Sequence, residues 1–289
     1  MQYTGRFAPS PSGRLHFGSL VCAVGSYLRA RSLGGRILLR IEDLDYYRCS
    51  AKYTDIIIRE LHELGFEYDG EPYIQSEHQD IYLEVAKKLE DKALAYGCSC
   101  SRATLRSTGC ICKREHFERK RGLSLRFPLS AYTADSFEDE LLGKVSCPIR
   151  SKDLTLIRGD NVISYNLACV TDDILQGVTE VVRGSDLCDI TTSQLCLYKA
   201  LNTQPPHYLH LPLVMENETY KLSKQNRAQP VMTLASPSGL LIMALEFLNQ
   251  DTRSYSESMK PAEILKKAAG DFTVQSIPKG PKLCPALWT

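Results

Sequence analysis

The stretch RFAPSPSGRLHFGSL, from Arg6 to Leu20, decides how this chain begins to fold. A short apolar run at residues 3–8 predicts a strand before it, and the apolar spacing over 18–33 predicts a helix after it. The prolines stiffen the turn, while Gly13 and Gly18 let its backbone approach a ligand closely. Because the unpaired N–H groups at a helix start attract anions, the segment predicts a site for a phosphate or carboxylate. The alternative is a plain connector rich in proline, serine and glycine.

Strand and helix patterns alternate along most of the chain. Compact apolar runs at 36–43 and 207–215 predict strands, and amphipathic repeats predict helices over 52–65, 76–97, 189–201 and 238–250. This alternation is typical of an α/β fold with a parallel sheet, in which ligands bind at the carboxyl edge of the strands. Residues 98–150 break the alternation with cysteines, a basic run and short β-like pieces, so we expect an inserted subdomain there.

The composition limits the class of protein. The chain has 289 residues, of which 43% are apolar and 24% charged, as in soluble globular proteins. It contains no apolar run long enough for a membrane span and no secretion signal at its start, so we expect a cytoplasmic protein without a membrane partner. The net charge of +1 means that any nucleic-acid partner must bind a local basic patch.

A second polar loop, KLSKQN at residues 221–226, follows the strand predicted at 207–215. Lys221 and Lys224 flank Ser223, and lysines in such a loop can neutralise charge that develops on phosphate groups. Taken alone, the loop is more typical of a solvated surface.

Four of the eleven cysteines are clustered: Cys98, Cys100, Cys110 and Cys112. An odd number of cysteines without a secretion signal argues against a disulfide framework. Two close pairs of thiols can surround one Zn²⁺ ion tetrahedrally and staple a small insertion that has little core of its own. A closed site of four thiolates predicts a structural zinc ion; four unliganded thiols are the alternative.

Together the two loops resemble the class I aminoacyl-tRNA synthetases. PSPSGRLHFGS at residues 9–19 resembles the HIGH signature of that family, and KLSKQ resembles its KMSKS loop. The resemblance implies a Rossmann-like catalytic domain that binds ATP with Mg²⁺. It also implies catalytic roles for His16 and Lys224, and the ATP-binding residues that it implies are His16, Gly18, Ser19, Lys221, Ser223 and Lys224.

RFAPSPSG and RIEDLD look like the branch of the family that uses L-glutamate. Two carboxylates and one ammonium group on this substrate suit arginines and an acidic residue. By resemblance the glutamate pocket comprises Arg6, Phe7, Ala8, Pro9, Ser10, Glu42, Tyr165 and Arg183. Four neighbouring residues match the same family and are expected to shape the pocket: Asp172, Asp173, Gln176 and Gly177.

Only about 60 residues follow the KLSK loop, too few for the anticodon-binding domain of a glutamyl-tRNA synthetase. Within the family, this length and KLSKQN resemble the glutamyl-Q tRNA(Asp) synthetases, which activate glutamate without tRNA and transfer it to queuosine in the anticodon of tRNA(Asp). Two alternatives remain: a truncated glutamyl-tRNA synthetase that charges a tRNA 3′ end, and a non-catalytic tRNA-binding paralogue. The expected units are 1–97 and 151–250 for the catalytic domain, 98–150 for the insertion and 251–289 for a tail.

The zinc pattern usual in this family, Cys-x-Cys followed by Tyr-x-x-x-Cys, is only partly present. It aligns best if Cys110 replaces the tyrosine and Cys112 is the last ligand, with His116 as a reserve ligand. We expect a monomer. The candidate tRNA contacts are the basic residues Lys113, Arg114, Arg119, Lys120, Arg121, Lys266 and Lys267, for which a solvated charged face is the alternative.

Overall fold

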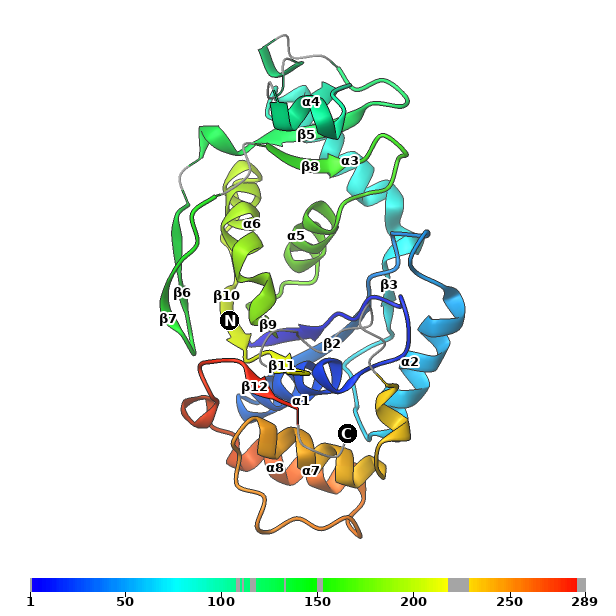
Figure 1. Ribbon diagram of the computed structural model, residues 1–289, viewed down its shortest axis with the longest axis vertical. Coiled ribbons are helices and arrows are strands. Elements are labelled where there is room, and N and C mark those ends of the chain that lie inside the picture. Colours follow the sequence, from blue (N-terminus) through cyan, green and yellow to red (C-terminus); the bar gives the residue numbers. More distant parts are fainter. Residues whose placement is uncertain are drawn as a thin grey trace.

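The computed structural model describes residues 2–107, 110, 112–114, 118–132, 134–149, 153–217 and 229–284 (Figure 1). Its helices are α1 (Phe17–Ser32), α2 (Ala51–Glu63), α3 (Gln79–Asp91), α4 (Arg102–Ser107), α5 (Tyr165–Leu175), α6 (Cys188–Ala200), α7 (Pro237–Phe247) and α8 (Pro261–Asp271). Its strands are β1 (Thr4–Phe7), β2 (Arg36–Ile41), β3 (Tyr73–Ile74), β4 (Tyr96–Cys98), β5 (Ser124–Pro128), β6 (Ser136–Asp139), β7 (Gly143–Ser146), β8 (Asp153–Ile157), β9 (Glu180–Gly184), β10 (His207–Leu211), β11 (Val214–Met215) and β12 (Lys282–Leu283). None of the helices in these ranges is both long and apolar enough to cross a membrane.

Parallel strands form the centre of the molecule. One group has the order β1-β2-β3, and a second group places β9 beside β10. Backbone N–H of Thr179 donates to the carbonyl of Thr4 at 2.9 Å, which brings the start of β9 against β1. In space these parallel strands therefore lie in the order β3-β2-β1-β9-β10. Strands that follow one another in the chain extend outward in one direction from β1 to β3 and in the opposite direction from β9 to β10, so the order reverses between β1 and β9. Such a reversal is where Rossmann-like folds bind their ligands, so the predicted fold class is confirmed.

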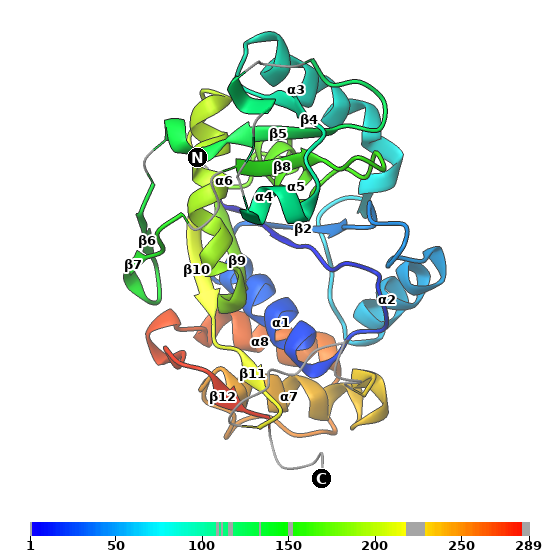
Figure 2. The ribbon, with the colours of Figure 1, turned by 45° about the horizontal axis from the view of Figure 1, so that its top comes forward.

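One face of this sheet is covered by α1, and α7 and α8 pack behind α1 (Figures 1 and 2). The largest apolar core lies here and includes Phe17, Leu20, Ile37, Leu240 and Ile264, all fully buried. Gly65 ends the turn after α2 with φ +78°, and a Cβ at this position would lie 2.6 Å from the backbone of Ala262 in the first turn of α8. The core therefore holds the first strand, α1 and the C-terminal helices in one unit.

A separate antiparallel sheet of β4, β5 and β8 forms the subdomain at the end of the molecule opposite α7 and α8 (Figures 1 and 2). A second apolar core joins it to α3, α5 and α6 and includes Tyr82, Phe127, Leu156, Leu167 and Leu197. The hairpin of β6 and β7 lies elsewhere, because β6 pairs in parallel with β10 at the edge of the central sheet.

Three expectations for secondary structure need correction. The helix predicted over 76–97 is a short 3₁₀ turn followed by α3, which ends before β4 because Ala93 adopts φ 56°. The strand predicted over 207–215 is broken into β10 and β11 at Pro212. The tail after residue 250, for which the sequence predicts no helix, contains α8, whose side chains Ile264 and Leu265 are buried against the core.

Candidate active site

A cavity of about 700 Å³ opens at the carboxyl ends of β1, β2 and β9, where the order of strands reverses. It is the structural feature that brings the predicted residues together, because residues from six separate segments of the chain line it. All predicted glutamate and ATP residues that the structure describes are among them: Arg6, Phe7, Ala8, Pro9, Ser10, His16, Gly18, Ser19, Glu42, Tyr165 and Arg183.

The loop between β1 and α1, residues 8–16, which we call the opening loop, is held by hydrogen bonds and an ion pair to neighbouring elements. Its Pro9 carbonyl accepts from the N–H of Glu42 at 3.0 Å, and its Pro11 carbonyl accepts from the N–H of Ser50 at 3.1 Å. Arg14 meets the buried carboxylate of Glu60 at 2.6 Å. These bonds fix the loop against the end of β2 and against α2, so they define the shape of this wall of the cavity.

His16 is the N-cap of α1. Its Nδ1 atom accepts from the N–H of Ser19 at 3.2 Å, so the neutral ring carries its proton on Nε2 and can donate from that atom. A Cβ at Gly18 would lie 3.1 Å from the His16 ring, a tight contact that glycine avoids. The arrangement places a donor and the positive end of a helix at the cavity, as an anionic phosphate requires.

Arg6 is held by a buried carboxylate. Its Nε atom donates to Asp173 Oδ1 at 3.2 Å, and its Nη1 atom donates to the Val182 carbonyl at 3.3 Å. Asp173 also accepts from Arg40 at 2.8 Å. Although burial acts in the opposite direction, the two guanidinium groups keep the pKa of Asp173 below its usual range. Asp173 therefore stays ionised and orients Arg6 toward the cavity.

Glu42 lies beside Arg40 but is not satisfied by it. The two side chains approach at 3.6 Å between Glu42 Oε1 and Arg40 Nε, and neither atom has a hydrogen-bond partner among the described residues. Burial raises the pKa of the Glu42 carboxyl to about 7, although Arg40 and Arg6 lower it. A cationic group that entered the cavity would find an acceptor here that the protein itself leaves open.

Sequence reasoning missed the role of Arg40. It is fully buried, and it contacts Asp173, Asp172 and Gln176 besides Glu42. Asp172 in turn accepts from Gln75 at 2.6 Å and from the Tyr82 hydroxyl at 2.9 Å. The alternation of Arg40 and Glu42 within RIED was visible in the sequence, but the acidic partners lie more than 130 positions away.

Arg183 is oriented by a second network of hydrogen bonds, separate from the one around Arg6 and Arg40. Its Nη atoms donate to Gln194 at 2.9 Å and to Thr191 at 2.7 Å, and Nη1 lies 3.4 Å from the Tyr165 hydroxyl. Its Nε atom donates to His210 Nε2 at 3.1 Å.

His210 must therefore accept on Nε2 and carry its proton on Nδ1, which donates to Asp139 at 2.7 Å. Burial lowers the pKa of His210, so the ring stays neutral in this role. Asp139 comes from β6, in the hairpin that pairs with β10, and sequence reasoning gave it no function.

The remaining predicted ATP residues, Lys221, Ser223 and Lys224, lie outside the described residues. The described residues on either side of this segment lie near the start of α1. Val214 lines the cavity before the segment, and after it the N–H of Val231 donates at 2.8 Å to the carbonyl of Leu15, the residue that precedes His16.

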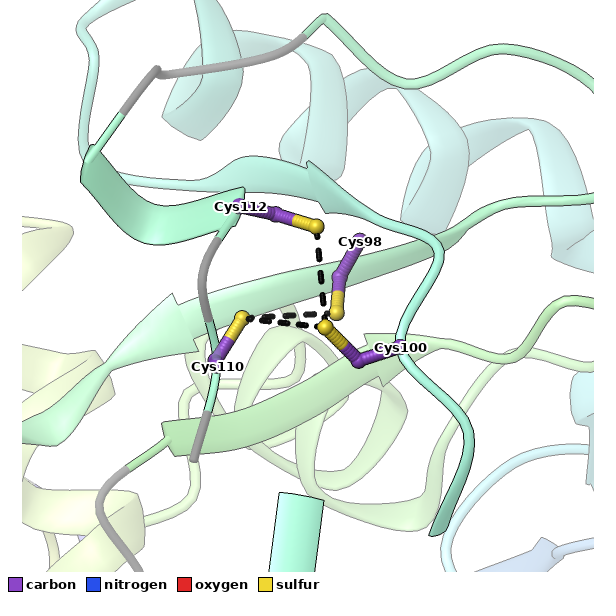
Figure 3. A group of neighbouring side chains, drawn as sticks. All are labelled: Cys98, Cys100, Cys110 and Cys112. Carbon is purple, nitrogen blue, oxygen red and sulfur yellow. Dashed lines mark hydrogen bonds between the residues drawn. The ribbon is translucent and has the colours of Figure 1, made fainter. Parts of the chain in front are cut away.

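The four clustered cysteines face one another at the subdomain (Figure 3). Their sulfur atoms are separated by 3.5 Å between Cys98 and Cys110, 4.0 Å between Cys100 and Cys110 and 3.7 Å between Cys100 and Cys112. A metal ion with four sulfur ligands at about 2.3 Å would hold them about 3.8 Å apart. The cluster therefore fits a tetrahedral metal site. The reserve ligand His116 lies outside the described residues.

The basic candidates for tRNA contact do not form one surface. Lys113 is paired with Asp153 at 3.4 Å, and Arg119 donates to the Leu123 carbonyl, so both hold the subdomain together. Lys120 and Arg121 are exposed beside them, and the side chain of Arg114 is outside the described residues. Lys266 and Lys267 lie on α8, at the opposite end of the molecule (Figures 1 and 2).

The fold and the cavity define a class I tRNA synthetase catalytic domain. The family model for the catalytic domain of class I tRNA synthetases (E and Q) matches residues 2–122 and 110–245. A crystal structure of a glutamate tRNA ligase from Elizabethkingia meningosepticum in complex with its amino acid superposes with a TM-score of 0.79 at 22% identity, over 99% of this chain and 68% of that one.

The similarity to curated relatives identifies the branch of this class to which the chain belongs. Glutamyl-Q tRNA(Asp) synthetase of Escherichia coli K12 is 39% identical over 285 residues, 96% of this chain and 91% of that protein. The protein of the same name from Photorhabdus laumondii is 40% identical over 97% of this chain and 90% of its own length. The chain therefore belongs to the glutamyl-Q tRNA(Asp) synthetase family and is a ligase of the aminoacyl-tRNA synthetase type.

Proposed function

We propose that this chain activates L-glutamate with ATP in the absence of tRNA and then transfers it to queuosine in the anticodon of tRNA(Asp). The observation that carries the proposal is the cavity at the strand reversal. It combines two oriented arginines, Arg6 and Arg183, with an unsatisfied carboxyl, Glu42. The names of the relatives, which cover nearly the whole chain, support the same acceptor.

Each residue has a role in the proposal. Arg6 and Arg183 bind the carboxylates of glutamate, and Glu42 binds its ammonium group. The hydroxyls of Tyr165 and Ser10 fix the orientation of the substrate. Arg183 and Tyr165 lie within hydrogen-bond reach of one another, so one carboxylate can contact both.

The first step places ATP at the start of α1. A glutamate α-carboxylate oxygen attacks the α-phosphorus, an oxygen–phosphorus bond forms, and the bond from that phosphorus to the bridging oxygen breaks to release pyrophosphate. His16 donates to the phosphates with Gly18 and Ser19 beside it, and Lys221, Ser223 and Lys224 stabilise the leaving pyrophosphate, with Mg²⁺ as counterion. Val214, before the segment that carries these lysines, lines the cavity, and Val231, after it, is hydrogen-bonded to the carbonyl of Leu15, which supports this role.

In the second step a hydroxyl of queuosine attacks the carbonyl carbon of glutamyl-adenylate. The new ester bond forms, AMP leaves with the electron pair of the broken bond, and the hydroxyl proton passes to solvent. Positioning and charge stabilisation account for both steps without a dedicated base.

We also propose that Cys98, Cys100, Cys110 and Cys112 hold a structural zinc ion. Four thiolates favour zinc, and the site has no open position for catalysis. The division into a catalytic domain (1–97 and 151–250), an insertion (98–150) and a tail (251–289) stays part of this proposal, as does a cytoplasmic monomer. Within it, β8 completes the sheet of the insertion, and the β6–β7 hairpin and α8 pack on the catalytic domain.

Pyrophosphate exchange and acylation test the function. Exchange should require glutamate and ATP but no tRNA, and a strict requirement for tRNA would instead indicate an ordinary glutamyl-tRNA synthetase. Acylation should then be compared on tRNA(Asp) with and without queuosine. Equal acylation of an unmodified transcript would refute the acceptor, and release of the label with the 3′-terminal adenosine after ribonuclease A digestion would indicate charging at that end.

A further inference from the structure

The loop between β2 and α2 carries two exposed aromatic side chains that the proposed chemistry does not use. Tyr46 is 60% exposed and Tyr47 65% exposed, the largest values for big apolar side chains in the described part of the chain. Neither ring belongs to any of the apolar cores formed by the described residues. Their retention on the surface is therefore not explained by packing.

The two rings form one surface. Their centroids are 4.4 Å apart with planes at 35°, and the hydroxyl of Tyr46 donates to that of Tyr47 at 3.3 Å. The guanidinium of Arg158 lies 5.9 Å from the centroid of Tyr47. We call Tyr46 and Tyr47 the tyrosine pair.

The tyrosine pair lies at the rim of the catalytic cavity. Leu44, Asp45 and Arg48, the residues on either side of it in the chain, line the cavity, as does Arg158. The loop is also pinned, since the N–H of Arg48 donates to the Asp45 carbonyl at 2.9 Å and that of Ser50 donates to the opening loop. A preformed aromatic surface therefore lies next to residues that line the cavity.

Aromatic rings beside arginines suit one kind of partner. Unpaired RNA bases stack on tyrosine rings, and nearby guanidinium groups contact the adjoining phosphates. We propose that the tyrosine pair is a stacking platform for an unpaired base of the RNA whose acceptor group enters the cavity. The inference rests on the proposed function, because it is that function which brings an RNA loop to this rim.

The base can come from two sources, an anticodon loop or a 3′ end, and both present unpaired bases. Direct binding distinguishes them. Two labelled RNAs serve as probes: the anticodon stem-loop of tRNA(Asp), and an acceptor minihelix that ends in CCA. Their affinities are measured by fluorescence anisotropy at one fixed salt concentration, since phosphate contacts make binding salt-dependent.

Three variants separate stacking from other effects. Tyr46→Ala with Tyr47→Ala removes both rings, and Tyr46→Phe with Tyr47→Phe keeps the rings without the hydroxyls. Leu33→Ala is the matched control, because Leu33 is 50% exposed but lies at the far end of α1 from the cavity. Pyrophosphate exchange without RNA should be unchanged in all three, which also shows that each variant is folded.

The double alanine variant should bind the stem-loop at least about tenfold more weakly, as expected for the loss of one stacked base. Its KM for tRNA(Asp) in the transfer reaction should rise to the same extent. The double phenylalanine variant and the control should stay within about twofold of the parent protein. Binding and transfer by the double alanine variant at the parent level would overturn the platform.

Failure of the proposed function gives a different pattern. If the minihelix rather than the stem-loop depends on the tyrosine pair, the platform is supported while the anticodon acceptor is refuted. If neither RNA depends on the pair, the platform is refuted, whichever RNA the protein acylates.

Discussion

Replacement of the buried carboxyl at the cavity, Glu42→Gln, should change stability in a way that depends on pH. The carboxyl has a pKa of about 7 in the folded chain because it is buried, against 4.5 for an ordinary glutamate. The amide side chain of the variant would resemble the protonated carboxyl at every pH. The difference in unfolding free energy between the two proteins therefore reports the cost of ionising Glu42.

Whether the parent protein gains or loses stability as pH rises depends on whether the folded or the unfolded state binds the proton of Glu42 more tightly. Below pH 4.5 both states are protonated and the pKa difference contributes nothing. Between pH 4.5 and about 7 the unfolded chain releases its proton while the folded chain keeps it, so the parent protein loses stability as pH rises. Above about pH 7 the loss is complete and amounts to roughly 3 kcal/mol relative to the glutamine variant.

Urea unfolding at pH values from 4.5 to 8 measures this difference. The control is Glu63→Gln, on the exposed end of α2, which should show no comparable dependence on pH. A constant difference between the parent and Glu42→Gln over this range would refute the assignment of the raised pKa to Glu42.

The same ionisation should govern substrate binding. An ammonium group binds the ionised carboxyl, which is about one-tenth populated at pH 6 and about nine-tenths populated at pH 8 for a pKa of about 7. The KM for glutamate in pyrophosphate exchange should therefore fall about tenfold between these pH values. In Glu42→Gln it should be high and independent of pH; a flat profile in the parent protein would contradict the ammonium-binding role.

Four further substitutions have defined outcomes. His210→Ala removes the acceptor of the Arg183 Nε–H, so the KM for glutamate should rise about tenfold or more while the KM for ATP in the same exchange assay stays unchanged. Gly65→Ala should lower the unfolding free energy by at least about 2 kcal/mol, because its φ is +78° and a Cβ would lie 2.6 Å from the backbone of α8. Gly70→Ala, with φ +88° and nothing within 4 Å of its Cβ, should cost only about 1 kcal/mol in the same urea titration. Cys98→Ser should reduce bound zinc in metal analysis from about one ion per chain to nearly none and make residues 98–150 more sensitive to protease, whereas an unchanged zinc content would remove the metal site.

Local patterns were enough for much of the catalytic domain. The helical spacing over 18–33, the strand at 36–43 and the turn between Arg6 and His16 depend on neighbours a few positions apart, and the structure has all three in place. The four cysteines were also visible as two close pairs, and their sulfur atoms lie within 4.8 Å of one another. Chemistry carried by one loop or one short segment can be read from the sequence because its geometry is local.

The long polar contacts were not visible in this way. Arg40 meets Asp173 and Arg183 meets His210 only because the parallel strands set segments far apart in sequence side by side. Likewise, the hairpin of β6 and β7 reached the central sheet by pairing with β10, and not by any pattern of its own. A buried charge takes its partner from whichever element the topology brings to it, so the sequence determined the chemical groups of this site, and the tertiary structure decided which of them hold the others in place.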